Sequence, residues 1–456
     1  MKRSPLDLFH PAVREWFSGA FPEPTTPQQL GWPAIARGES TLILAPTGSG
    51  KTLAAFLWCL NRVMFEPPPP KPSRCRILYV SPLKALAVDV ERNLRAPLAG
   101  VANLAHASGT AMTMPEVAIR TGDTPALERS RFLREAADIL ITTPESLFLL
   151  LTSNARERLK TVDTVIIDEI HALVPGKRGA HLALSIERLE AIRSGAPVQR
   201  IGLSATQRPL EEVARFLGGA EPRRSSKRRM PAKKRDTTAG STHADVEAEL
   251  HGEFGDERGP AGYRPVTIVD ASEKKRLALR IEVPVEDMAR PFDSRASNGL
   301  AQGKPLHSRT SDPLARGKLE DLPSGPASQG AVRPSIWSSV HPRLLELIRA
   351  HQSTLLFVNS RRLAERLAGA LNELAGEPLV RSHHGSLARA ARSEVEDLLK
   401  AGRIKALVAT SSLELGIDMG AIDLVVQIES PPSVASGLQR IGRAGHQAGA
   451  VSEGIV

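Results

Sequence analysis

Short apolar runs alternate with amphipathic stretches over the first half of this chain. Most runs are apolar at successive positions and rich in β-branched residues, which is typical of parallel strands covered by helices on both faces. The pattern predicts a doubly wound α/β domain over residues 1–218. The expected strands are 41–46, 76–82, 116–122, 138–144, 164–169 and 200–206.

The same alternation resumes later and predicts a second, similar α/β domain over residues 336–456. A helix is expected over 361–374, and the closing VSEGIV is expected to start a further strand. Since the chain stops ten residues after the motif QRIGRAGH at 439–446, we expect this second domain to be C-terminally incomplete. Its other expected strands are 354–360, 379–385, 406–412 and 424–430.

Residues 219–335 interrupt the alternation, and we interpret them as a linker with low-complexity insertions. A short apolar piece at 265–288 has the character of folded chain. The stretches before and after it, 219–265 and 289–334, are polar and rich in Ser, Gly, Pro and charged residues. Because they lack the apolar side chains needed for a core, we expect them to be disordered.

Charge is unevenly distributed along the chain. The net charge is +10, yet the run Glu221–Arg235 alone holds eight basic residues and one acidic residue. The remainder is nearly balanced, so net charge says little about function. The basic run at 223–235 could bind nucleic acid through phosphates, or it could be a solvated charge block. Aromatic residues make up only 4%, which favours backbone contacts over stacked bases in any nucleic-acid complex.

Cysteine content and hydropathy set the expected compartment. Cys59 and Cys75 are the only cysteines and form no CxxC pair, so we expect two buried inert thiols and no structural zinc. No apolar run approaches the ~18–20 residues of a membrane span, and the N-terminus has no apolar signal core. We expect a cytoplasmic protein.

The clearest chemical motif is the segment Ala45–Thr52, APTGSGKT, which lies between an expected strand and an expected helix. This is the context of a P-loop, whose glycines let backbone N–H groups face phosphates. Lys51 is expected to hold the β- and γ-phosphates of ATP, and Thr52 to ligate Mg²⁺. The expected nucleotide-binding residues here are Thr47, Gly48, Ser49, Gly50, Lys51 and Thr52.

A second acidic site closes the apolar run TVIID. Asp168 and Glu169 follow a strand at its carboxyl end, where ligands lie in open parallel sheets. Asp168 is expected to bind Mg²⁺ and Glu169 to polarise the attacking water. An acidic pair alone is uninformative, but together with a P-loop upstream it predicts ATP hydrolysis.

With these sites in view, the chain resembles superfamily 2 helicases over residues 1–218 and 336–456. The similar segments include the upstream TTPQQ, DEIH at 168–171, SAT at 204–206 and QRIGRAGH at 439–446. Motifs Ia, Ib, IV and V are matched by SPLKALAVD, TPESL, FVNSRR and ATSSLELGIDMG. In detail they are most similar to the large helicase-related (Lhr) family. The resemblance implies two tandem RecA-like domains with ATP between them.

The resemblance also assigns roles to individual residues. Arg443 would be the arginine finger that meets the γ-phosphate, with Arg440 in support. His446 stands where many helicases have Arg, as is typical of the Lhr type. The remaining roles are adenine reading by Gln29, ribose contacts by Gly416 and Asp418, and coupling by His171, Ser204, Thr206 and Gln439.

Nucleic acid is the partner that the resemblance implies. The backbone of single-stranded DNA, or of a DNA or RNA–DNA duplex, would be gripped by loop residues at strand ends. Phosphate contacts of this kind position the strand without reading its sequence. The candidates are Lys84, Thr143, Arg361, His384 and Thr410.

The expected function is therefore an ATP-driven monomeric helicase that moves 3′ to 5′ on single-stranded DNA and unwinds duplexes, with a role in DNA repair. Two alternatives stay open: a translocase that moves without unwinding inside a larger assembly, and a non-catalytic nucleic-acid-binding protein. The presence of Lys51, Asp168, Glu169 and Arg443 together argues against the non-catalytic alternative. If further domains complete the motor, we expect residues 1–456 alone to hydrolyse ATP weakly and unwind poorly.

Overall fold

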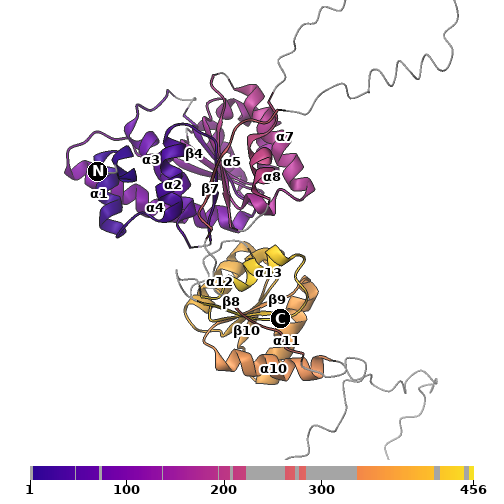
Figure 1. Ribbon diagram of the computed structural model, residues 1–456. Helices are drawn as coiled ribbons and strands as arrows, with labels where there is room; N and C mark the ends of the chain where they lie inside the picture. The colour runs from indigo at the N-terminus through magenta and orange to yellow at the C-terminus, as the bar shows by residue number, and fades with distance from the viewer. Residues whose placement is uncertain are drawn as a thin grey trace, which may run out of the picture. The chain divides into compact units, whose positions relative to one another are not determined.

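A computed structural model shows two units, each built on its own sheet (Figure 1). By contacts, the first unit groups Met1–Leu277 with Ser412–Asp418 and Pro432–Ser452, and the second holds the rest. The structure describes all residues except 1–3, 47, 71–73, 136, 194, 206–208, 222–261, 273–276, 284–335, 415–421 and 446–450, and the side chains of 389, 393 and 412.

The first unit contains a seven-stranded sheet in the order β3-β4-β2-β5-β6-β1-β7, with every pair parallel. The six strands expected from the apolar runs are confirmed, and β7 adds a seventh. The strands are β1 (Thr41–Leu44), β2 (Ile77–Val80), β3 (Val117–Arg120), β4 (Ile139–Thr142), β5 (Thr164–Ile167), β6 (Gln199–Ser204) and β7 (Thr267–Asp270).

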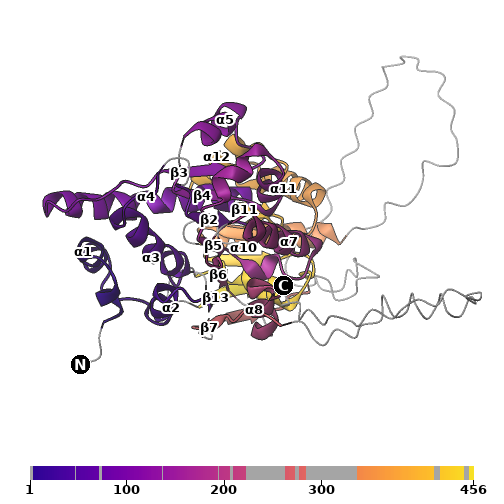
Figure 2. The same ribbon diagram turned by 90° about the horizontal axis from the view of Figure 1, so that it is seen from above.

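Helices cover both faces of this sheet, as Figure 2 shows from above. Strand side chains alternate between the two faces, so that Ile77 and Tyr79 enter one core, and Leu78 and Val80 enter the other. One face carries α1 (Pro11–Ala20), α2 (Thr26–Ala36), α3 (Lys51–Phe65) and α4 (Lys84–Ala107), and the other carries α6 (Pro144–Leu151), α7 (Lys177–Ile192) and α8 (Leu210–Gly218).

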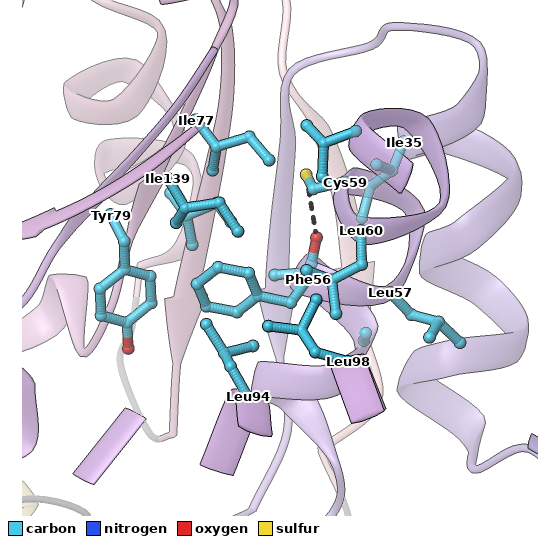
Figure 3. Close-up of a cluster of buried hydrophobic side chains, with 14 of the residues drawn as sticks. Ile35, Phe56, Leu57, Cys59, Leu60, Ile77, Tyr79, Leu94, Leu98 and Ile139 are labelled. Carbon is cyan, nitrogen blue, oxygen red and sulfur yellow. Dashed lines mark hydrogen bonds between the residues drawn. The ribbon is translucent and has the colours of Figure 1, made fainter. Parts of the chain in front are cut away.

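The core beneath α3 and α4 is tightly packed (Figure 3). The rings of Phe56 and Tyr79 stack with centroids 5.1 Å apart, next to Leu94 and Ile139. Each such side chain contributes roughly 1.5–3 kcal/mol when it leaves water. This core therefore anchors α3, whose first residue is Lys51, against the strands that carry the acidic site.

The second unit contains a six-stranded sheet in the order β10-β11-β9-β12-β13-β8. The closing strand expected from VSEGIV is confirmed as β13, and the helix expected over 361–374 is confirmed as α11. The elements are β8 (Leu277–Arg280), α10 (Trp337–Ala350), β9 (Thr354–Phe357), α11 (Arg361–Ala375), β10 (Val380–His383), α12 (Arg389–Lys400), β11 (Ala406–Ala409), β12 (Leu424–Gln427) and β13 (Ser452–Ile455). The helix α13 (Val434–Ile441) precedes β13 in the chain.

The units differ from the sequence-derived domain boundaries in two respects. The expected linker 219–335 supplies an edge strand to each sheet, since β7 pairs with β1 and β8 lies next to β13. In addition, α13 groups by its contacts with the first unit. Both differences arise because strand pairing and helix packing join segments that are distant in sequence.

The described ends of the first insertion are held together. Ala220 and Tyr263 form an antiparallel bridge, and the N–H of Glu221 donates to the carbonyl of Gly262 at 2.9 Å. Arg264 reinforces the closure by pairing with Glu187 at 2.7 Å. The basic run at 223–235 lies outside the described residues, as do most of the first stretch expected to be disordered and all of the second, 289–334.

Both cysteines are buried, as expected, and burial raises the pKa of each thiol to about 12. Among the described helices, none is long and apolar enough to cross a membrane.

Candidate nucleotide-binding site

The P-loop lies between β1 and α3, and its glycines have the conformation that the motif requires. Gly48 and Gly50 both have φ of 79°, in the left-handed region that favours glycine. A Cβ at Gly50 would also lie 2.6 Å from Nε2 of Gln28. Thr47 lies outside the described residues.

The amine of Lys51 is buried and bound by the loop itself. Nζ donates to the carbonyl oxygens of Ala45 at 2.7 Å and Pro46 at 2.9 Å. Burial lowers the pKa of Lys51, although the charges of Glu169 and Asp168 oppose the shift. The cation therefore lies at the acidic site, where it faces the carboxylates that follow β5.

Asp168 is fixed by two donors, one on each carboxylate oxygen. The backbone N–H of Glu169 donates to Oδ1 at 2.9 Å, and the hydroxyl of Tyr79 donates to Oδ2. Burial, with the neighbouring charge of Glu169, raises the pKa of the Asp168 carboxyl to about 7. The contact with Tyr79 was absent from the sequence analysis.

Glu169 has a left-handed backbone conformation, and one of its carboxylate oxygens has no hydrogen-bond donor among the described residues. Among the described residues it is the only non-glycine with positive φ, at 44°. Its carboxylate is buried, and Oε2 accepts no hydrogen bond from any described residue. Buried acceptors normally have partners, so this oxygen is suited to a ligand such as water.

The acidic site fits a magnesium ion that is carried by a nucleotide. Asp168 and Glu169 are adjoining buried carboxylates, and Thr52 lies one residue after Lys51 in α3. Within the described ranges, no three or more His, Cys, Asp and Glu side chains form a metal cage. Mg²⁺ in phosphate sites usually takes only one or two protein oxygens and completes its shell with phosphate and water.

His171 links three of the expected motifs. Its Nδ1 lies 3.2 Å from Oγ of Ser204 at the end of β6, and its Nε2 meets the side-chain amide of Gln439 in α13. Burial lowers the pKa of His171, which favours the neutral imidazole. The structure thus brings together three of the four predicted coupling residues, and Thr206 lies outside the described residues.

Arg443 is buried beside the acidic site. Nη2 donates to the carbonyl of Glu414 at 3.0 Å, while Nε and Nη1 have no partner among the described residues. Burial lowers the pKa of Arg443, and the charges of Glu169 and Glu414 oppose this. Arg440 instead forms an ion pair with Glu414 at 3.1 Å. Gly416, Asp418 and His446 lie outside the described residues.

The structure favours Gln28 over its neighbour as the glutamine that contacts the P-loop. Nε2 of Gln28 is 3.4 Å from the carbonyl of Gly50, and Oε1 accepts from the N–H of Thr25. Gln29, the residue expected to read adenine, is exposed and donates to the carbonyl of Pro24. Thr25 also donates to the carbonyl of Ser49 at 2.9 Å.

A cavity of about 580 Å³ adjoins the P-loop, within the usual size range of ligand sites. One end is formed by Lys51, Thr52 and the two carboxylates. Most of the other lining residues are apolar and come from α1, α3 and α4, among them Trp16, Phe56 and Leu94, and Phe21 directly after α1 also lines the cavity.

Of the five residues expected to contact nucleic acid, two are exposed and three are buried or half-buried. Lys84 is exposed and pairs with Asp123 at 2.6 Å, and Arg361 is exposed and donates to Ser386. Thr143 is buried and donates to Ser146, and His384 is buried against Glu365. Thr410 is half-buried directly after β11. Lys84 and Arg361 are therefore the stronger candidates for phosphate contacts.

Comparison with known proteins agrees with this site. Residues 25–214 match the DEAD/DEAH box helicase family, and residues 340–448 match the helicase conserved C-terminal domain. Together with the two parallel sheets and the P-loop, these matches define the motor region of a superfamily 2 helicase.

Relatives that align with nearly the whole of this chain identify the family more narrowly. The chain is 44% identical to the Lhr helicase/probable uracil glycosylase of Mycolicibacterium smegmatis over 99% of its own length and 26% of that protein. It is 39% identical to the ATP-dependent helicase Lhr-Core protein 2 of Thermococcus barophilus, over 97% of this chain and 43% of the relative. The chain belongs to the large helicase-related (Lhr) family.

A solved structure supports the same assignment. The structure of Mycobacterium smegmatis helicase Lhr bound to ssDNA and AMP-PNP matches with a TM-score of 0.74 and 45% identity, over 99% of this chain and 48% of that one. The chain therefore spans about a quarter to a half of the length of these relatives.

Proposed function

We propose that this chain is the motor of an enzyme that hydrolyses ATP to move 3′ to 5′ along single-stranded DNA, unwinds DNA or RNA–DNA duplexes and serves DNA repair. Its family membership supports the class of activity. The relative bound to ssDNA and AMP-PNP supports the choice of strand and nucleotide for this chain.

The observation that carries the proposal is the cluster of buried charges beside the P-loop. Lys51 and Arg443 are buried cations, and Asp168 and Glu169 are buried carboxylates whose charges act on them. Isolated buried charges are costly, so such a cluster is stable only when its members offset one another or bind a ligand. A triphosphate would supply the acceptors that Nε and Nη1 of Arg443 lack.

Each residue then has a distinct task in hydrolysis. On nucleotide binding, the Lys51 amine exchanges the carbonyls of Ala45 and Pro46 for phosphate oxygens. Thr52 and Asp168 would hold Mg²⁺, which supplies charge neutralisation at the β- and γ-phosphates. Glu169 orients and polarises the attacking water through Oε2, which lies 3.4 Å from Nδ1 of His171 but accepts no hydrogen bond from a described residue. Arg443 stabilises the charge that develops on the γ-phosphate.

A polar chain connects this chemistry to the rest of the motor. Glu169 and Ser204 both lie within reach of Nδ1 of His171, and Gln439 meets the other ring nitrogen. A change at the γ-phosphate site would therefore reposition β6 and α13. This gives hydrolysis a route to movement along the strand.

An ATPase assay with and without single-stranded DNA and RNA tests the proposal. We expect turnover that rises with single-stranded DNA and disappears in Lys51→Ala. Strand separation on duplexes with a 3′ or a 5′ single-stranded tail then tests direction. Stimulated turnover without separation in a version extended through further domains would favour translocation alone, and absence of any turnover would refute the proposal.

A further inference from the structure

Tyr79 lies at the acidic site, although it belongs to none of the helicase motifs described above. It is the third residue of β2 and is fully buried. One side of its ring stacks on Phe56 of α3 at an interplanar angle of 27° (Figure 3). The packing fixes the ring, so the hydroxyl has a defined position.

That position is at the carboxylate of Asp168. The hydroxyl donates to Oδ2, while the backbone N–H of Glu169 donates to Oδ1. One donor on each oxygen fixes the plane of the carboxylate. The remaining lone pairs of the two carboxylate oxygens then point in one fixed direction.

The two contacts differ in origin. The Glu169 N–H comes from the residue next to Asp168 and moves with the same segment of chain. The Tyr79 hydroxyl comes from a neighbouring strand, because β2 pairs with β5. The Tyr79 hydroxyl therefore holds the Asp168 side chain in place relative to the neighbouring strand β2. Because the Tyr79 ring stacks on Phe56, the same residue also fixes Asp168 relative to α3, the helix that carries Lys51 and Thr52.

We propose that Tyr79 is a positioning residue of the ATPase site, whose hydroxyl holds the Asp168 carboxylate in the orientation that receives Mg²⁺. The inference rests on the proposed function, because it takes Asp168 as a ligand of that ion. A purely structural role would differ: the hydroxyl would stabilise the folded chain without affecting how the nucleotide and the ion bind.

Tyr79→Phe separates the two roles, because it removes the hydroxyl and keeps the stacked ring. The measurement is binding of a fluorescent, non-hydrolysable ATP analogue as Mg²⁺ is titrated, with a parallel series in EDTA. We expect the half-saturating Mg²⁺ concentration to rise about tenfold, since a hydrogen bond to a charged group is lost. Binding in EDTA should be unchanged, because Lys51 and the P-loop are untouched.

The chain offers a matched control in its other tyrosine. Tyr263 is half exposed, lies near the guanidinium of Arg215 and is remote in sequence from the site. Tyr263→Phe should leave the Mg²⁺ titration as in the wild type. Thermal unfolding without nucleotide, measured for both variants, records any general loss of stability.

A double-mutant cycle with Asp168→Asn tests whether Tyr79 acts through Asp168. In the Asp168→Asn background, Tyr79→Phe should cause no further change in Mg²⁺ dependence. An additive effect, or a Tyr79→Phe variant that is less stable but has wild-type Mg²⁺ dependence, would overturn the inference. A wild-type chain without Mg²⁺-dependent nucleotide binding would overturn the proposed function, and the inference with it.

Discussion

The imidazole Nδ1 of His171 lies 3.2 Å from the hydroxyl oxygen of Ser204, and both side chains are buried. We expect Ser204→Ala to reduce strand separation about tenfold, the loss expected when one buried hydrogen bond is removed. Nucleotide binding should be unchanged, because Ser204 contacts the P-loop only through its backbone carbonyl, which accepts from the N–H of Ala45 at 3.1 Å and is kept in the variant. Parallel assays of ATP binding, turnover and unwinding measure this in a version of the protein that unwinds.

Ser185 provides the control for that substitution. It is equally buried, but it lies in α7 and donates to the carbonyl of His181. Ser185→Ala should lower stability slightly and leave the ratio of unwinding to turnover unchanged. If both serine variants lose unwinding alike, the coupling role of Ser204 is wrong.

The roles of Lys51 and Glu169 should separate in binding experiments. Lys51→Ala removes the cation at the phosphate site, so nucleotide binding and turnover should both be lost. Glu169→Gln should lower turnover by at least about 10²-fold while nucleotide still binds, because the carboxylate acts on water. Equilibrium binding of an ATP analogue and steady-state turnover check both. Near-normal turnover in Glu169→Gln would contradict the assignment.

Arg443→Ala should reduce turnover by about 10³-fold and spare nucleotide affinity, as expected for an arginine finger. Arg443→Lys should restore little, because a lysine lacks the planar set of donors. The control is Arg95→Ala, which removes an exposed arginine paired with Glu91 in α4. Equal losses of affinity and turnover in Arg443→Ala would identify a ground-state ligand instead.

Replacing residues 222–261 by an Asn-Gly turn should leave the motor intact. Glu221 and Gly262 are already joined by a hydrogen bond, and the flanking pair forms an antiparallel bridge that a two-residue turn can close. We expect a melting temperature within about 2 °C of the parent and unchanged turnover. A large fall in melting temperature would show that the excised segment packs on the unit.

The same variant decides between the two interpretations of the basic run. If the run binds phosphates, the excision should flatten the salt dependence of DNA affinity. If it is a solvated charge block, the slope should match the parent. Fluorescence anisotropy over a series of salt concentrations distinguishes the two outcomes.

The thiols of Cys59 and Cys75 should be unreactive in the folded chain. Burial raises both pKa values to about 12, so each group stays a neutral thiol. At about pH 8 we expect a thiol reagent to label neither cysteine until denaturant is added, because the thiolate is the reactive form. Rapid labelling of the native protein would indicate that one of these core positions opens.

Local patterns predicted the parts of this structure that depend on neighbours in sequence. The apolar runs predicted every strand of the two sheets except β7 and β8, and the spacing of Gly48, Gly50 and Lys51 predicted the glycine-containing loop between β1 and α3. Edge strands were harder, since β7 and β8 are largely exposed and lack a continuous buried pattern. Their place in the two sheets follows from pairing with distant strands.

Side-chain partners across the fold could not be predicted from sequence alone. The contact between Tyr79 and Asp168 spans 89 positions. Nothing in the adjacent pair Gln28 and Gln29 shows which amide faces the loop. His384 lies at a strand end, as expected of a phosphate contact, but in the structure it is buried against Glu365.

The backbone of Glu169 has an evolutionary consequence. A left-handed conformation costs a non-glycine residue roughly 1–2 kcal/mol, so glycine would be the more stable choice at this position. Random mutation judged by stability alone would therefore drift away from glutamate here. If Glu169 acts on the attacking water as proposed, Glu169→Gly would abolish turnover while the free energy of unfolding rises.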